Sequence, residues 1–237
     1  MKLTTTKILP AVFLIGMASA TVADEHEMSV SGFMSDYTNL EKVTDGSADY
    51  RYLAPGAEDR MLQYNAIMID QPEIFIAADS PYKGIKPKHL NALAESLRTG
   101  LSAALGEEIY VVDRAGENVV YLTVAISELK LEKVKKKPLQ YLPVALVVGG
   151  VAGAASSDIA KKANFDGLVF ELEAFDSMTG ERIVALIDHL DRIGDQPGSW
   201  EEVDEFMAKY GHVIACRYAN ARLPEEARAD CLAEVRE

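Results

Sequence analysis

The fold of this chain is decided by FDGLVFELEAFDSMTGERIVALID, residues 165–188. On both sides of DSMTGE, apolar residues alternate with polar or small ones, which is the pattern of a strand with one buried face. DSMTGE itself consists largely of residues that favour tight turns. The stretch therefore predicts two antiparallel strands joined in a β-hairpin.

Upstream of the hairpin, the sequence predicts one long strand and one clear helix. Residues 118–134 alternate in the same way as the hairpin and predict the strand. Between residues 86 and 105, leucines recur every three or four positions and Gly106 follows, so this segment predicts the helix. Shorter strand-like runs occupy residues 64–70, 73–78 and 108–113.

The C-terminal end predicts two helices, at residues 200–222 and 223–235, with Pro224 at the entrance of the second. The order of all these elements predicts an α+β fold. We expect an antiparallel sheet with helices on one face, and a helical hairpin at the C-terminus.

The two cysteines, Cys216 and Cys231, fall in the two predicted C-terminal helices, at nearly equal distances from Pro224. In an antiparallel helical hairpin their sulfurs would lie at the same height, and an even pair in an exported chain is first interpreted as a disulfide. A metal site would need further ligands of suitable spacing, and none is nearby in the sequence. We therefore expect a Cys216–Cys231 disulfide.

The first residues indicate export. Residues 1–20 contain two lysines, a short apolar core and the small-residue cleavage signal ASA, as in a secretory signal peptide. Cleavage after Ala23 is the alternative, and no cysteine near the cut is available to accept a lipid. We expect a periplasmic or secreted protein with an extended arm at residues 24–60 and a single α+β domain at residues 61–237.

Composition and motifs exclude several functions. The chain has 24 basic and 37 acidic residues, and this negative charge argues against nucleic-acid partners. It has no HExxH or GxSxG motif. A set of polar residues at the end of the hairpin has too few oxygen ligands for a calcium-binding loop, so we interpret it as a turn. It consists of Asp188, His189, Asp191 and Asp195. We expect no catalytic motif, no metal and no cofactor.

Residues 138–157 carry no charge and include PVALVVGGVAGAASS. A transmembrane helix there would invert the positive-inside rule, and Val148 stands where a dinucleotide-binding loop needs glycine. We favour a buried or half-buried connection between strands. The small residues Gly149 and Gly153 leave self-association or contact with a membrane surface as alternatives.

A cluster of lysines, residues 133–137, precedes this apolar run, and we expect it to lie on a solvated strand edge. The alternative is a contact surface for a partner or for anionic lipid, made by the lysine cluster and the apolar run together. The candidate contact residues are Lys133, Lys135, Lys136, Lys137, Val144, Leu146, Val148, Gly149 and Gly153.

Five stretches in succession resemble a family of bacterial exported proteins, domain of unknown function family 3313 (DUF3313). They are SGFMSDYTNL (31–40), YRYLAPGA (50–57), DSPYKGI (79–85), EAFDSMTGERIVALID (173–188) and WEEVDEFMAKYG (200–211). The resemblance implies an envelope protein, a lipoprotein in many members, with no established catalytic activity and no catalytic residues. This chain departs from that pattern because its leader lacks the lipid-accepting cysteine.

Together these features predict an exported cell-envelope protein that acts by binding, as an accessory factor, rather than by catalysis. Its partner would be another envelope protein or a lipid surface. One alternative is a periplasmic hydrolase whose site is assembled only in space, which a deep pocket with a buried His189 or a Ser–His pair would favour. Another is a self-assembling or membrane-surface component that acts through residues 138–157.

Overall fold

The computed structural model describes residues 27–44, 47–80, 86–131, 165–166, 168–190, 197 and 202–233. The strands in these residues are β1 (Glu41–Lys42), β2 (Tyr50–Leu53), β3 (Ala66–Ile69), β4 (Glu73–Ile76), β5 (Tyr110–Val112), β6 (Val119–Leu131), β7 (Phe165–Asp166), β8 (Val169–Asp176) and β9 (Arg182–His189). The α-helices are α1 (Ala57–Met61), α2 (Pro87–Leu105) and α3 (Val203–Asn220). The predicted α+β class is confirmed.

The predicted hairpin forms the centre of the sheet as β8 and β9. The two strands pair antiparallel with Leu172 opposite Leu186. In the turn, the Asp176 side chain accepts hydrogen bonds from the backbone N–H groups of Met178 and Thr179. Gly180 has a φ of 70°, which a residue with a side chain rarely adopts. Local chemistry therefore specifies this turn.

The sheet is mixed, whereas an antiparallel sheet was expected from the sequence. Its strand order is β1-β2-β9-β8-β6-β3-β5, with β4 and β7 also paired to β6. The pairs β3–β5, β3–β6 and β4–β6 are parallel. Helix α2 lies between β4 and β5 in the chain, and a helical crossover brings the chain back in the same direction. Alternation of residues indicates which face a side chain takes but not the direction of its strand, so the sequence pattern did not reveal this.

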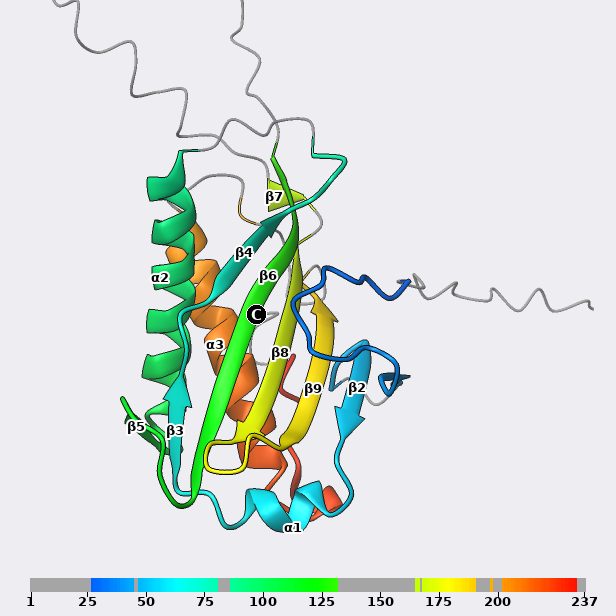
Figure 1. The fold of residues 1–237 in the computed structure, drawn as a ribbon, viewed down its shortest axis with the longest axis vertical. Helices are drawn as coiled ribbons and strands as arrows, with labels where there is room; N and C mark the ends of the chain where they lie inside the picture. Colours follow the sequence, from blue (N-terminus) through cyan, green and yellow to red (C-terminus); the bar gives the residue numbers. More distant parts are fainter. Residues whose placement is uncertain are drawn as a thin grey trace, which may run out of the picture.

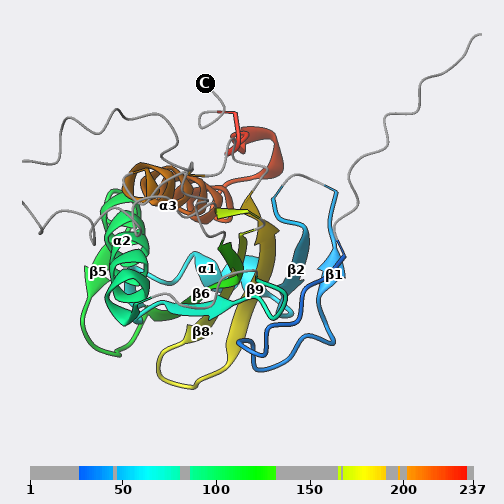
Figure 2. The same cartoon turned by 90° about the horizontal axis from the view of Figure 1, so that it is seen from above.

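Helices α2 and α3 lie on the same side of the sheet, as predicted (Figures 1 and 2). They touch each other through two glycines, because a Cβ added at Gly211 would lie 2.6 Å from the carbonyl oxygen of Gly100. The inward face of α2 presents Leu93, Leu97 and Leu101, which are all fully buried. The main core lies between this helix pair and the sheet.

The predicted C-terminal helical hairpin is only half correct. Helix α3 forms, but the second predicted helix is reduced to one 3-10 turn, Glu225–Ala227. The Asn220 side chain intervenes, since its amide donates to the Ala229 carbonyl oxygen at 2.8 Å and its oxygen accepts from the Ala229 N–H at 2.9 Å. These bonds hold the returning chain in a non-helical path beside the end of α3.

The segment expected as an arm, residues 24–60, contributes elements to the domain itself. Strand β2 pairs with β9 and is therefore part of the sheet. Residues 28–40 pack on the sheet face opposite the helices, where Met34 joins a second apolar cluster with Val169 and Ile187. The aromatic residues Phe33, Tyr37, Tyr50 and Tyr52 border this cluster. No described helix is both long and apolar enough to span a bilayer.

Candidate functional site

A cavity of about 710 Å³ lies between the helix-facing side of the sheet and residues 221–232, which we call the C-terminal segment. Ligand pockets in proteins commonly enclose about 300–1,000 Å³. On the sheet side its walls include Leu122, Leu172 and Leu186, and on the side of α3 they include Ile214 and Tyr218. Most of the lining is apolar, so the cavity suits an apolar ligand.

Regular periodicity places these wall residues. Leu172 and Leu186 are cross-strand partners on β8 and β9, so both side chains point to the same face. On α3, Ile214 and Tyr218 are four residues apart and therefore share one side of the helix. The cavity lies where these two faces meet.

A disulfide and an ion pair are among the connections that hold the C-terminal segment over the cavity. The disulfide Cys216–Cys231 ties it to α3, with 5.6 Å between the Cα atoms, and this confirms the pairing predicted from the sequence. The guanidinium of Arg228 lies 3.4 Å from the carboxylate of Glu58 on α1. Together with the Asn220–Ala229 hydrogen bonds, these connections attach the segment to neighbouring elements at several points.

One charged side chain, Arg217, lines the cavity from within. Only 10% of its side chain is exposed, and its Nη1 lies 2.7 Å from Oδ2 of Asp188, which is fully buried. Burial alone would lower the pKa of Arg217, but the combined effect of Asp188 and Tyr210 outweighs it and the pKa is raised. Burial, followed by the charge of Asp188, raises the pKa of Tyr210 well above its ordinary value. Arg217 is therefore charged and Tyr210 neutral.

The guanidinium of Arg217 is enclosed together with the carboxylate of Asp188. Its Nη1 faces Oδ2 of Asp188 at 2.7 Å, and all three of its nitrogen atoms are buried. Removing one partner of such a buried pair leaves an uncompensated charge, which is costly. The side chain of Arg217 therefore forms part of the cavity wall, but its nitrogen atoms are not exposed to the cavity.

The mouth of the cavity carries charges of both signs. Arg51 and Arg228 contribute positive charge, whereas Glu58, Glu225 and Asp230 contribute negative charge. Arg51 donates a hydrogen bond to Ser47 at 2.7 Å. The rim as a whole does not select for either sign of ligand charge.

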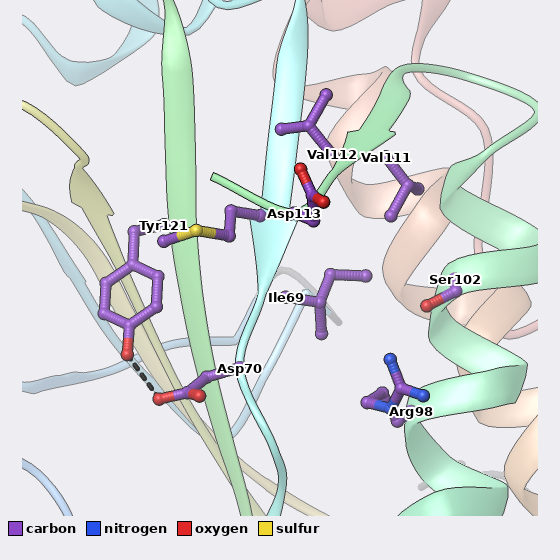
Figure 3. Close-up of a pocket in the computed structure, with 9 residues that line it drawn as sticks. Ile69, Asp70, Arg98, Ser102, Val111, Val112, Asp113 and Tyr121 are labelled. Atoms are coloured by element: carbon purple, nitrogen blue, oxygen red, sulfur yellow. Dashed lines mark hydrogen bonds between the residues drawn. The ribbon is translucent and has the colours of Figure 1, made fainter. Parts of the chain in front are cut away.

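A second hollow, of about 750 Å³, lies between α2 and strands β3 and β5. Figure 3 shows Tyr121 and Asp70 hydrogen-bonded on one side of Ile69, with Arg98 and Ser102 on the other side. Burial and the bond to Asp70 raise the pKa of Tyr121 to about 12. Because the polar groups do not converge on one point, this hollow offers no evident chemistry.

The opposite face of the sheet carries a polar seam beneath the N-terminal residues. Glu173 accepts hydrogen bonds from the Ser35 hydroxyl at 2.8 Å and from Arg182 at 2.9 Å. Glu171 accepts from the Tyr37 hydroxyl at 2.6 Å. Both glutamates are buried, so the seam is structural, and it fastens residues 35–37 to β8.

The candidate residues at the end of the hairpin, Asp188 and His189, contact different partners. Asp188 and His189 do not form a shared site, because Asp188 pairs with Arg217 while His189 Nδ1 lies 2.8 Å from Asp49 Oδ2. The described part of the chain contains no cluster of three residues suited to hold a metal ion. The candidate contact residues between Lys133 and Gly153, and the leader, lie outside the described residues.

Arg217 was not among the site residues predicted from the sequence, although a signal was present. Arg217 lies three residues after Ile214 and one before Tyr218, on the apolar side of its helix. Asp188 comes two residues after Leu186 and four after Val184, so it lies on the same, apolar side of its strand. Two opposite charges on two apolar faces predict a buried ion pair.

Comparisons with known proteins give a family match and several weak structural likenesses, among them the two that follow. A family model described as "Protein of unknown function (DUF3313)" matches residues 29–212. No curated protein matches the chain. A PelC dodecamer from Paraburkholderia phytofirmans is 11% identical, with a TM-score of 0.32, over 68% of this chain and 92% of that chain.

The second likeness is to a homolog of neuraminyllactose-binding hemagglutinin from Helicobacter pylori. It is 12% identical, with a TM-score of 0.30, over 77% of this chain and 95% of that chain. Likenesses at this level carry no argument about function.

Proposed function

Starting from the fact that this chain belongs to the DUF3313 family, whose function is unknown, we propose that it is a non-catalytic binding protein of the cell envelope. Its binding site is the cavity beneath the C-terminal segment, and its ligand is a small, mainly apolar molecule. The observation that carries this proposal is the cavity itself, about 710 Å³ with largely apolar walls.

The chemistry of the lining favours binding over hydrolysis. Among the described residues that line the cavity, the only serine is Ser47 and there is no histidine. The hydroxyl of Ser47 accepts a hydrogen bond from Arg51, and the Nδ1 of His189 lies beside Asp49 instead of a serine. A nucleophile with an adjacent base, which acyl transfer needs, is therefore not assembled in the described lining.

The proposed compartment is the periplasm or the medium outside the cell. The Cys216–Cys231 disulfide supports this proposal, because disulfides persist in oxidising compartments and are rare in the cytosol. Cell fractionation followed by mass spectrometry of the N-terminus tests it. We expect an envelope or secreted fraction with the chain cut after Ala20 or Ala23. Intact chain confined to the cytosol would overturn this part of the proposal.

Binding can be tested with N-phenyl-1-naphthylamine, an apolar probe that fluoresces when it leaves water. We expect saturable fluorescence with the full chain. Ala174 lines the cavity, so Ala174→Leu should reduce binding by filling part of it. Ala103→Leu, at an exposed position on α2, is the matched control and should leave binding unchanged.

Circular dichroism should first show that both variants are folded. Equal, non-saturable fluorescence for the wild type and both variants would refute the cavity as a binding site.

A further inference from the structure

We propose that residues 223–228 form a flap at the mouth of the cavity, and that the ion pair between Arg228 and Glu58 is the latch that holds this flap closed. A ligand enters and leaves between the flap and α1. This inference rests on the proposed function, since it requires that the cavity bind a ligand. It names the route of entry and the two residues that regulate it.

The flap has little packing against the rest of the protein. Residues 223–230 are all exposed, whereas Cys231 and Leu232, which follow directly, are buried. Glu225 and Arg228 nevertheless line the cavity, so this exposed stretch borders its mouth. Segments with few buried apolar contacts open at a low cost in free energy, and the lids of binding sites are drawn from such segments. The flap has the properties of a lid.

Both ends of the flap are fixed to the body of the protein. Before the flap, the guanidinium of Arg222 donates a hydrogen bond to the carbonyl oxygen of Tyr64 at 3.3 Å. After the flap, Ala229 exchanges two hydrogen bonds with the Asn220 side chain, and the disulfide follows two residues later. An outward movement of the flap therefore requires no change at either end.

One ion pair closes the side of the flap that faces α1. Nη2 of Arg228 lies 3.4 Å from Oε1 of Glu58, and the two side chains are 37% and 70% exposed. Water competes for such a pair, so it contributes little to stability and breaks readily. The Nε of Arg228 donates to the carbonyl oxygen of Leu223 at 3.2 Å, within the flap, so the guanidinium moves with it. The pair is therefore suited to act as a reversible latch.

A latch affects the rates of binding and leaves the affinity unchanged. The ion pair forms in the closed flap whether or not the cavity holds a ligand, so breaking it favours the open flap equally in both cases. Association and dissociation should then accelerate by the same factor, and Kd should stay constant. A side chain that contacts the ligand would change Kd instead.

Stopped-flow fluorescence of N-phenyl-1-naphthylamine with the full chain measures both rates. Glu58→Gln and Arg228→Gln should each raise both rate constants about two- to fivefold, which is the factor that an exposed ion pair can contribute. Glu58→Arg combined with Arg228→Glu reverses the pair and should restore the wild-type rates. The matched control is Glu181→Gln, which removes another ion pair of α1, with Arg60, and neither of these residues lines the cavity. It should leave both rates unchanged.

Salt provides a test that leaves the sequence unchanged. The probe is uncharged in neutral buffer, whereas salt screens the exposed charges of the latch. Raising NaCl from about 20 mM to about 500 mM should bring the wild-type rates close to those of Arg228→Gln. The rates of this variant should change little over the same range, because its latch is already absent.

The outcomes separate this inference from the proposed function. If the probe binds saturably but both single variants keep the wild-type rates, the inference is wrong while the cavity remains a binding site. The same holds if the variants change Kd without accelerating association, since the two side chains would then be ligand contacts. If the probe binds neither the folded wild type nor the single variants, the proposed function fails and the inference fails with it. The single variants and the salt series stand even if the reversed pair does not fold.

Discussion

Arg217 and Asp188 meet inside the protein, with 2.7 Å between the guanidinium Nη1 and the carboxylate Oδ2. The first residue comes from α3 and the second from the end of β9, so the ion pair connects the helix layer to the sheet. Arg217 also lines the candidate ligand cavity. The pair therefore bears on the stability of the fold and on the wall of that cavity.

Breaking this pair from one side should be costly. Arg217→Met would leave the Asp188 carboxylate buried without its partner, and we expect a loss of about 3–5 kcal/mol in the free energy of unfolding. Adding Asp188→Asn to the same chain should recover most of the loss, because no charge then remains buried. Urea denaturation measures both values. A double variant as unstable as the single one would show that packing, and not charge, governs this position.

The disulfide should stabilise the fold mainly by restricting the unfolded chain. Its cysteines are 15 residues apart, and a loop of that length corresponds to about 3 kcal/mol. We expect Cys216→Ser with Cys231→Ser to lower the free energy of unfolding by about this amount. The same variant should bind the apolar probe more weakly, since the C-terminal segment covers the cavity. Unchanged stability in the presence and absence of reductant would contradict the first expectation.

The crossing of α2 and α3 should tolerate no side chain at Gly211. Alanine is a better helix former than glycine by about 1 kcal/mol. At Gly211, however, the added Cβ would lie 2.6 Å from the Gly100 carbonyl oxygen and would push the helices apart. We expect Gly211→Ala to destabilise the protein by about 1–3 kcal/mol, measured by thermal or urea unfolding. Gly116→Ala is the control, since its Cβ would meet only Val119 at 3.5 Å and should cost little.

The polar seam should control how firmly the N-terminal residues are attached. Arg182 and Glu173 form a largely buried pair, with 12% and 4% of their side chains exposed. In Arg182→Met we expect faster amide hydrogen exchange at Ser35, whose N–H donates to Glu173. Arg60→Met removes a more exposed ion pair with Glu181 and is the matched control, because such pairs contribute about 0–1 kcal/mol. Equal exchange in both variants would exclude a fastening role for the seam.

Asp176 should make the hairpin turn sensitive to acid. Hydrogen bonds from the turn, first of all from the backbone N–H of Thr179, lower the pKa of Asp176 below 3.8. A lowered pKa in the folded state means that the ionised carboxylate stabilises the fold above its unfolded pKa. That contribution is lost as the pH falls through the lowered value. We expect Asp176→Asn to be less stable than the wild type at pH 7, by urea denaturation. The difference should shrink below about pH 4. A deficit that stays constant down to pH 2 would contradict this expectation.

Local patterns in the sequence determined the hairpin at residues 165–188, the long strand β6, the helix α2 and the disulfide partner of Cys216. Each depends on spacing between neighbours in the chain, which periodicity records directly. The disulfide prediction was right for a partly wrong reason, because the second helix does not form. Hydrogen bonds from the Asn220 side chain to the backbone of Ala229 hold the chain in a non-helical path before Cys231. The predictions for residues 138–157 stay predictions.

Only the tertiary structure decided the directions of β3, β4 and β5, the burial of Glu171 and Glu173, and the cavity beside Arg217. Alternation along β8 places the two glutamates on one face, and nothing in that pattern shows that residues 28–40 will cover it. The cavity exists because α1, α3 and residues 221–232 meet the sheet without filling the space between them. Such a gap depends on contacts between segments far apart in the chain, and single-chain periodicity carries no information about those distances.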